Sequence, residues 1–259
     1  MKWAFYFLFF FSVHLYSQDS LKAVLVESSP LKVQSIIGTD NFDAQYYINN
    51  NVFYKKIDSK TINFSAIQLG EIASTDIYNP LKMILFYKDF NTVIVLDNRL
   101  ADIYKIDFNV RQPYRNVSHV SVGNDNTIWT FNQDLQQLQL YDYLNNQIRA
   151  TALPVVSNVL HLASNYNYAW LLTENYIYKY SYFGSMLYKI KNDGYTVAEE
   201  RNDDVILKKD NKLYFLKDKT EEIIPIILPE LLINQFFVTG ETLYIYDSET
   251  LYKFQLKNY

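Results

Sequence analysis

Two histidines in matching contexts are the residues whose types and spacing could do chemistry. His119 and His161 each end an Asn-Val-x-His motif, and the motifs begin 42 residues apart, at Asn116 and Asn158. An imidazole can bind a divalent metal ion or act as a general acid or base near neutral pH. On the inner strands of adjacent repeats, the two rings could approach each other at the centre of the fold. The alternative, which we favour, is a packing residue used twice, because no carboxylate stands at a ligand-like spacing from either histidine.

A tryptophan follows each histidine motif at a similar distance. Trp129 and Trp170 lie 41 residues apart, so one supersecondary unit has been used at least twice. That period is typical of the blades of a β-propeller. The indole rings could stack on a sugar or a base, but recurrence at a fixed strand position favours packing between blades.

A row of tyrosines follows the second motif. Tyr176, Tyr178, Tyr180 and Tyr182 occupy alternate positions of one expected strand and therefore share a face. Such a stripe could bind a protein or a glycan, because tyrosine offers a large contact area at a small cost in conformational entropy. Packing of the same rings against the next repeat is the alternative.

Short strands must position all of these residues. Runs rich in Tyr, Phe, Val and Ile alternate with turns rich in Asn, Asp and Ser, which is the pattern of β-strands. The chain has only six glycines, so Asn and Asp are expected to supply the left-handed turn residues. Strands such as 81–87 and 92–96 are apolar almost throughout, which indicates sheets covered on both faces.

Six three-strand units recur along the chain. We take the second strand of each at Phe53, Ile94, Trp129, Trp170, Tyr214 and Tyr244. The spacings are 41, 35, 41, 44 and 30 residues, with a mean near 38, which fits four-stranded blades with short connections. Residues 21–27 form an orphan strand, and the last unit lacks a fourth strand. The pattern therefore predicts an all-β fold, a single six-bladed β-propeller over residues 18–259, closed by the N-terminal strand pairing with the last blade.

The order and spacing of the expected strands resemble those of NHL-type and related six-bladed β-propellers. The resemblance is most specific at residues 180–190, Tyr-Ser-Tyr-Phe-Gly-Ser-Met-Leu-Tyr-Lys-Ile, which look like an outer-strand turn of that group. The chain has no Trp-Asp dipeptide, kelch double glycine or Asp-box, so five and seven blades remain alternatives. Similar propellers that act as lactonases hold a divalent cation in the channel with Glu, Asn and Asp. The candidate oxygen ligands here are Asn116, Asn158, Asp76 and Asp204.

The N-terminus predicts export. Lys2 precedes an apolar run at residues 3–13, and polar chain begins at Ser17. The run is too short to span a bilayer, so residues 1–17 are expected to be a secretory signal peptide, with no membrane-spanning segment after cleavage. The aromatic run ending in Tyr-Ser-Gln resembles the N-termini of exported proteins of the Bacteroidota. The chain has no cysteine, which excludes a lipobox, a disulfide framework and a thiol nucleophile.

Charge and motifs narrow the function. A formal net charge of −4 argues against a nucleic-acid partner. No phosphate loop, dinucleotide fingerprint, Gly-x-Ser-x-Gly or His-Glu-x-x-His pattern occurs, so no cofactor is expected beyond the divalent metal that His119 and His161 could hold. We expect an exported, non-enzymatic binding or scaffolding propeller in the periplasm or at the cell surface, with a protein or glycan partner at the cell envelope.

The alternative is a propeller hydrolase or lyase, similar to lactonases, with a metal in the central channel. The channel mouth distinguishes the two. Three or more convergent carboxylate, amide or imidazole groups there would favour the enzyme, and an exposed aromatic patch would favour partner binding.

Overall fold

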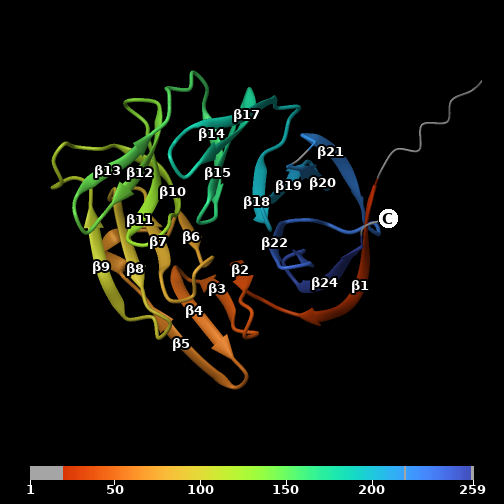
Figure 1. Ribbon diagram of the computed structural model, residues 1–259. Coiled ribbons are helices and arrows are strands. Elements are labelled where there is room, and N and C mark those ends of the chain that lie inside the picture. Colours follow the sequence, from red (N-terminus) through yellow and green to blue (C-terminus); the bar gives the residue numbers. More distant parts are fainter. Residues whose placement is uncertain (1–19, 219, 258–259) are drawn as a thin grey trace, which may run out of the picture.

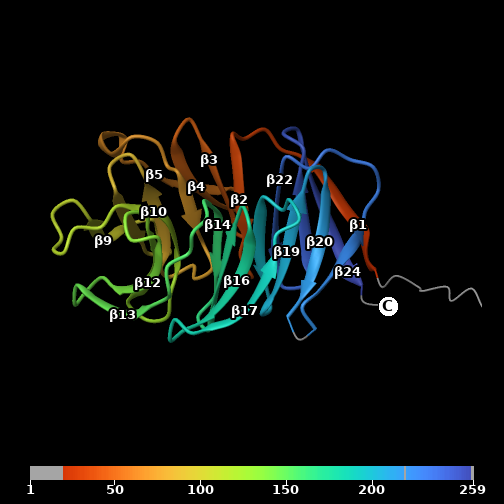
Figure 2. The ribbon, with the colours of Figure 1, turned by 90° about the horizontal axis from the view of Figure 1, so that it is seen from above.

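Strands make up nearly all the regular structure of the chain. A computed structural model describes residues 20–218 and 220–257, so the expected signal peptide lies outside the described residues. The sheets are arranged in a ring (Figure 1), and a view turned by 90° shows them side by side around it (Figure 2). No helix of the described residues is long and apolar enough to cross a membrane.

Four of the sheets have four antiparallel strands each, in chain order from the inside outward. The first two are β2 (Ser35–Thr39), β3 (Gln45–Asn49), β4 (Val52–Ile57) and β5 (Lys60–Phe64), then β6 (Ser74–Asp76), β7 (Met83–Tyr87), β8 (Thr92–Leu96) and β9 (Asp102–Asp107). The next two are β10 (Val117–Val122), β11 (Thr127–Asn132), β12 (Gln137–Asp142) and β13 (Gln147–Thr151), then β14 (Val159–Ser164), β15 (Tyr168–Thr173), β16 (Tyr176–Ser181) and β17 (Met186–Lys191). We call these sheets blades 1 to 4. A short 3-10 helix, η1 (Ile67–Leu69), connects blades 1 and 2.

The fifth sheet has eight strands and contains two further blades. Blade 5 is β18 (Val197–Arg201), β19 (Asp204–Lys209), β20 (Lys212–Lys217) and β21 (Glu222–Ile227). Blade 6 is β22 (Gln235–Thr239), β23 (Thr242–Tyr246), β24 (Thr250–Lys257) and, as its outermost strand, β1 (Leu21–Pro30). The fold is therefore a β-propeller whose topology is consistent with six four-stranded blades.

The N-terminal strand closes the ring, as the sequence predicts. Strand β1 pairs antiparallel with β24, from Lys22 opposite Lys257 to Pro30 opposite Thr250. It also pairs in parallel with β21, where Leu21 lies opposite Ile226. This second pairing was not predicted, and it joins blades 5 and 6 into one sheet (Figure 1).

The core lies between the blades. Trp129 packs with Tyr178 and Tyr180 between blades 3 and 4, and Trp170 packs with Ala198 and Leu207 between blades 4 and 5. The two indoles are 1% and 0% exposed. Packing, the alternative favoured for both tryptophans, is what the structure shows.

Asparagine and aspartate form most of the tight turns, as expected from the scarcity of glycine. They account for ten of the fourteen described non-glycine residues with positive φ. Some of these side chains also hold the connection to the next blade. Asn51 donates from Nδ2 to the carbonyl oxygen of Gly70 and accepts from the backbone N–H of Ile72, both at 2.8 Å. Asn91 and Asn211 hold the connections after blades 2 and 5 in the same way.

Cations supply a second connection between neighbouring blades. A buried lysine or arginine of one blade donates to a turn carbonyl of the next. The donor and acceptor pairs are Lys55 with Asn98, Lys82 with Gly123, Lys179 with Asp203, and Arg201 with Gly240. A charged donor satisfies carbonyl groups that would otherwise lose water on burial.

Candidate functional site

A cavity of about 1100 Å³ occupies the centre of the ring. The innermost strands line it, together with turns that follow them. Because every blade starts with a strand running in the same direction, these turns gather at one end of the channel. The turn residues are Asp40–Phe42, Ile77–Pro80, Asn165–Asn167, Asn202–Asp203 and Gly240. We call this end the channel mouth.

Carboxylates from opposite blades converge at the mouth. Asp76 ends β6 of blade 2, and Glu199 and Glu200 lie on β18 of blade 5. Both oxygens of Asp76 accept hydrogen bonds, Oδ2 from Ser121 Oγ at 2.8 Å and Oδ1 from the backbone N–H of Tyr78 at 2.9 Å. The Asp76 carboxylate therefore has a structural task in joining the inner strands.

An amide bridges two more carboxylates of the mouth. Asn165, in the turn after β14, donates from Nδ2 to Glu200 Oε1 at 2.9 Å and to Asp203 Oδ1 at 2.8 Å. The backbone N–H of Asp203 also donates to Glu200 Oε1. The bridge fixes both carboxylates beside the cavity.

Glu199 differs from the other acids of the mouth. Within the described residues, no hydrogen bond or ion pair reaches its carboxyl group, although its side chain lines the cavity. Burial raises the pKa of Glu199 to about 8, and the charges of Asp76 and Glu200 add to the shift. At neutral pH this carboxyl group is mostly protonated and can give up a proton when a charge arrives beside it.

Two tyrosines form an aromatic pair across the mouth. The rings of Tyr78, from blade 2, and Tyr166, from blade 4, meet edge to face with centroids 5.0 Å apart. Tyr78 is 44% exposed, and burial followed by the charge of Glu200 raises its pKa to about 12. The mouth thus offers ring faces next to carboxylates.

The structure places His119 and His161 on the neighbouring inner strands β10 and β14. Burial lowers the pKa of each to about 4, and the charge of His161 lowers that of His119 further. His119 Nδ1 lies 3.0 Å from Ser118 Oγ, whereas His161 Nδ1 is buried with no hydrogen-bond partner. Only His161 lines the cavity. Among residues 20–218 and 220–257, no group of three or more His, Asp or Glu is arranged to hold a metal ion.

Strict alternation along the strand would place Val117 on the same face as His119, but the structure does not. A β-bulge shifts the register between Val117 and His119, and the same bulge recurs between Val159 and His161. An extra residue in a strand reverses the alternation of side chains beyond it. Val117 therefore packs into the core between blades 2 and 3 with Val120, and it does not share a face with His119.

Of the four candidate oxygen ligands, only Asp76 lines the cavity. Asn116 donates to Asp134, and Asn158 donates to Glu174. Each amide therefore joins the residue before the first strand of its blade to a turn of the same blade. Asp204 accepts from the backbone N–H of Asp218. These residues cap strands and turns.

The tyrosine stripe of blade 4 lies inside the molecule. Tyr178 and Tyr180 are 6% and 2% exposed in the core between blades 3 and 4, and Tyr176 and Tyr182 pack against the same cluster. Lys189 Nζ lies 3.7 Å from the centroid of the Tyr176 ring. Packing, the alternative considered for this stripe, describes these rings.

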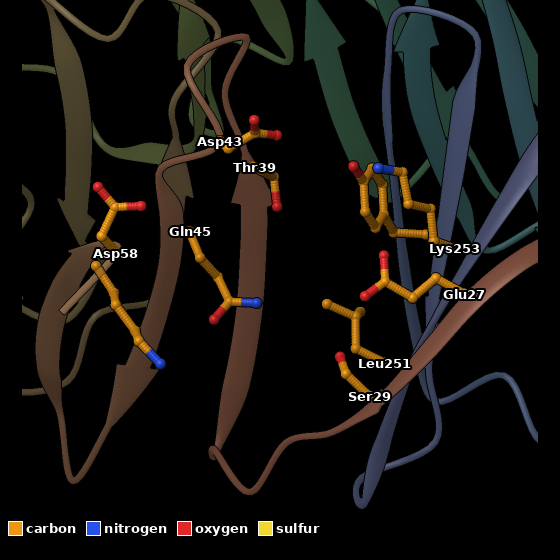
Figure 3. Close-up of a pocket in the computed structure, with 10 residues that line it drawn as sticks. Glu27, Ser29, Thr39, Asp43, Gln45, Asp58, Leu251 and Lys253 are labelled. Carbon is orange, nitrogen blue, oxygen red and sulfur yellow. The ribbon is translucent and has the colours of Figure 1, made fainter.

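A smaller groove of about 290 Å³ lies at the seam between the first and last blades. Thr39, Asp43 and Gln45 on one side face Glu27 and Lys253 on the other (Figure 3). The groove mixes both charge signs and has no aromatic pair across it. The central mouth is therefore the stronger candidate site.

Sequence reasoning missed most of the mouth. Glu199, Glu200, Tyr78, Tyr166 and Asn165 were not among the expected site residues. One signal was present in the sequence, because Glu199 and Glu200 are adjacent carboxylates. The mouth meets both criteria set for the two functions, since carboxylates, an amide and an imidazole converge there beside a partly exposed aromatic pair.

Comparisons with known proteins support the fold. No protein-family model and no curated protein matches the chain. Selenomethionine-substituted virginiamycin B lyase from Staphylococcus aureus is similar over 86% of this chain and 80% of its own, with a TM-score of 0.62 and 12% identity. The Pan2 WD40 domain from Neurospora crassa is similar over 88% and 76%, with a TM-score of 0.59 and 8% identity. BamB from Moraxella catarrhalis is similar over 88% and 73%, with a TM-score of 0.51 and 13% identity. At these identities the likeness concerns the β-propeller fold alone.

Proposed function

We propose that this chain is an exported binding propeller whose recognition site is the channel mouth. The observation that carries the proposal is the convergence of Tyr78, Tyr166, Glu200 and Asp203 from three blades onto one cavity. A rigid ring that holds polar and aromatic groups around a cavity is suited to recognition. We expect the partner to be a protein or a glycan of the cell envelope.

The position of the closing strand supports export. Strand β1 begins at Leu21, four residues after the expected cleavage near Ser17. Removal of the signal peptide would therefore leave the whole of β1 available to close the ring. We propose that the mature chain acts in the periplasm or at the cell surface. Cell fractionation and mass determination of the mature N-terminus would test this; a chain that keeps residues 1–17 in the cytoplasm would contradict it.

Capture from the native envelope tests the binding role. The tagged mature chain, a Tyr78→Ala/Tyr166→Ala variant and a Lys253→Ala variant would each be cross-linked in the envelope, and the bound molecules compared. We expect the mouth variant to lose them and the seam variant, Lys253→Ala, to keep them. The same capture by both variants and the wild type would contradict a recognition site at the mouth.

One observation favours an enzyme as the second candidate. The raised pKa of Glu199 and the unpartnered Nδ1 of His161 at one cavity are features of a proton-transfer site. A hydrolase or lyase would use Glu199 to move a proton. The residues present do not fit a channel metal, because both Asp76 oxygens already accept hydrogen bonds and no set of three ligands converges among the described residues. Lactone hydrolysis that is lost in Glu199→Gln would establish this candidate.

A further inference from the structure

We propose that the channel mouth binds a cationic group, a guanidinium or an alkylammonium carried on an apolar stem. This inference rests on the proposed recognition site and names the chemistry of its ligand. The group could come from an arginine or lysine side chain of a protein, or from a free amine. The argument starts from the charges that line the cavity.

Acidic side chains outnumber basic ones in the cavity lining. The acids are Asp40, Asp76, Glu199, Glu200 and Asp203, and the bases are Arg201 and Lys208. Within the described residues, neither base forms an ion pair with these five acids. Arg201 is 9% exposed, donates to the carbonyl oxygen of Gly240 and lies over the Phe215 ring. Lys208 lies opposite Val197, at the start of β18. Four residues of strand, roughly 13 Å, separate Val197 from Arg201 at the mouth end of β18.

Three of the acids stand where an incoming cation would meet them. Asp40 is already bound to Ala44 and Tyr46, which leaves it out of this set. Glu200 and Asp203 are held beside the cavity by Asn165 and keep unused acceptor positions. Glu199 lies deeper and has no hydrogen-bond partner among the described residues. A carboxyl group in such a position is free to accept a hydrogen bond from a ligand in the cavity.

The aromatic pair completes the environment of a cation. Tyr78 is close enough to Glu200, Asp203 and Asp76 for each of these charges to raise its pKa. A cation held by these carboxylates would therefore lie near the rings of Tyr78 and Tyr166. Cation–π attraction and burial of the stem against the rings would add to the charge pairing. An anion would meet repulsion from the same groups.

Binding of a cation should release a proton. At pH 7 Glu199 is mostly protonated, and a positive charge beside it would favour the ionised form and lower its pKa. About one proton per bound cation should leave at pH 7 and almost none at pH 9.5, where Glu199 is already ionised. Lys82 also titrates near pH 8 beside Asp76, and His161 is neutral throughout this range. A Glu199→Gln variant separates the Glu199 contribution from that of Lys82.

Calorimetric titration with matched probes tests the proposal. Acetyl-arginine methylamide carries the guanidinium of a peptide side chain, acetyl-citrulline methylamide is its neutral isostere, and agmatine represents a free amine. We expect the arginine probe to bind at least about tenfold more tightly than the citrulline probe. Tighter binding of agmatine than of the arginine probe would assign the ligand to free amines, and the reverse order would assign it to a protein side chain. Equal affinities for arginine and citrulline, or no binding of either cation, would overturn the cationic ligand.

Variants and buffers give a second readout. In buffers of different ionisation enthalpy, the wild type should release about one proton per arginine probe at pH 7, whereas Glu199→Gln should release only the smaller Lys82 contribution and bind more weakly. Glu71→Gln removes an exposed carboxylate outside the cavity and should behave as the wild type. Proton release as large in Glu199→Gln as in the wild type would overturn the role of this carboxyl group. The two proposals fail separately. If the cation probes did not bind but the mouth variant still lost envelope capture, recognition at the mouth would stand and the cationic ligand would not.

Discussion

The ammonium nitrogen of Lys82 lies 2.7 Å from the carbonyl oxygen of Gly123, across the interface between blades 2 and 3. It also donates to the carbonyl oxygens of Asp125 and Thr127, so one buried side chain satisfies three groups of a single turn. Burial lowers the pKa of Lys82 to about 8. The lysine is therefore mostly charged at neutral pH and loses its charge as the pH rises through 8.

Lys82→Met should destabilise the fold by about 2–4 kcal/mol, because three buried carbonyl groups lose a charged donor while the apolar stem is kept. Chemical denaturation monitored by tryptophan fluorescence would measure the change. Lys60→Met, at an exposed position of β5, is the matched control and should stay within about 0.5 kcal/mol of the wild type. Equal midpoints for the two variants would show that the turn does not depend on Lys82.

Removal of the closing strand should open the ring. A chain that starts at Lys32 lacks β1, including the buried residues Leu21 and Ala23, and exposes the edges of β21 and β24. We expect its thermal midpoint to fall by at least about 10 °C and its tendency to aggregate to rise. A chain that starts at Gln18 is the control and should unfold as the mature protein does. An unchanged midpoint for the shorter chain would refute closure by β1.

Acid should destabilise the protein through His119 and His161. Their folded pKa values of about 4 lie below the ordinary value of 6.5, so between these values the unfolded chain takes up protons that the folded chain does not. Stability that is fully present above pH 6.5 is lost as the pH falls towards 4, by at most about 3 kcal/mol per histidine. Lys88 contributes to the shift of His119, and the Ala198 backbone opposes that of His161.

The double variant His119→Gln/His161→Gln should show a flatter dependence of stability on pH between 6.5 and 4. Urea denaturation at several pH values would measure it, and a slope equal to that of the wild type would contradict the argument.

Zinc titration of a His119→Ala/His161→Ala variant tests the metal prediction. Equal zinc affinity of this variant and the wild type would remove the metal site.

Substitutions at Tyr178 and Phe183 compare a buried ring with an exposed ring in the tyrosine-rich blade. Tyr178→Ala should cost about 3–5 kcal/mol, because the ring is buried between blades 3 and 4. Phe183→Ala should change stability by about 0.5 kcal/mol or less, because that ring is 81% exposed. Thermal and chemical unfolding would compare them. Similar small losses in both variants would show that the stripe does not contribute to the core.

Most strands could be predicted from the sequence, and the missed ones have a physical reason. Strand β6 has only three residues, and β13 reads Gln-Ile-Arg-Ala-Thr on an exposed edge, so neither has an apolar run. Strand β2 contains Gly38, where a Cβ atom would come within 2.6 Å of Ile77 Cδ1. Glycine leaves room for this close approach, but it also weakens the strand signal.

The residues used to measure the repeat came from two different strand positions. Phe53, Ile94 and Tyr214 lie on third strands, whereas Trp129 and Tyr244 lie on second strands. A step from a third strand to a second is short, which explains the spacings of 35 and 30. The second strands begin at residues 45, 83, 127, 168, 204 and 242, so their true intervals are 38, 44, 41, 36 and 38.

The site was harder to predict than the fold. His161 was found because an imidazole suggests chemistry by itself, and Asp76 was found through the resemblance to lactonase propellers. Tyr78 and Glu199 belong to blades 2 and 5, and only closure of the ring brings them to one cavity. Local patterns contain no information on such a distant pairing, so the mouth emerged only with the tertiary structure.

The pairing of β1 with β24 and β21 also constrains the order in which the strands can pair during folding. Strand β1 precedes the other described strands, yet its partners β21 and β24 follow more than 190 residues later. The earlier blades can form while synthesis continues, but the first strand must wait unpaired until the final blade arrives. The ring therefore closes in a late step that joins strands far apart along the chain.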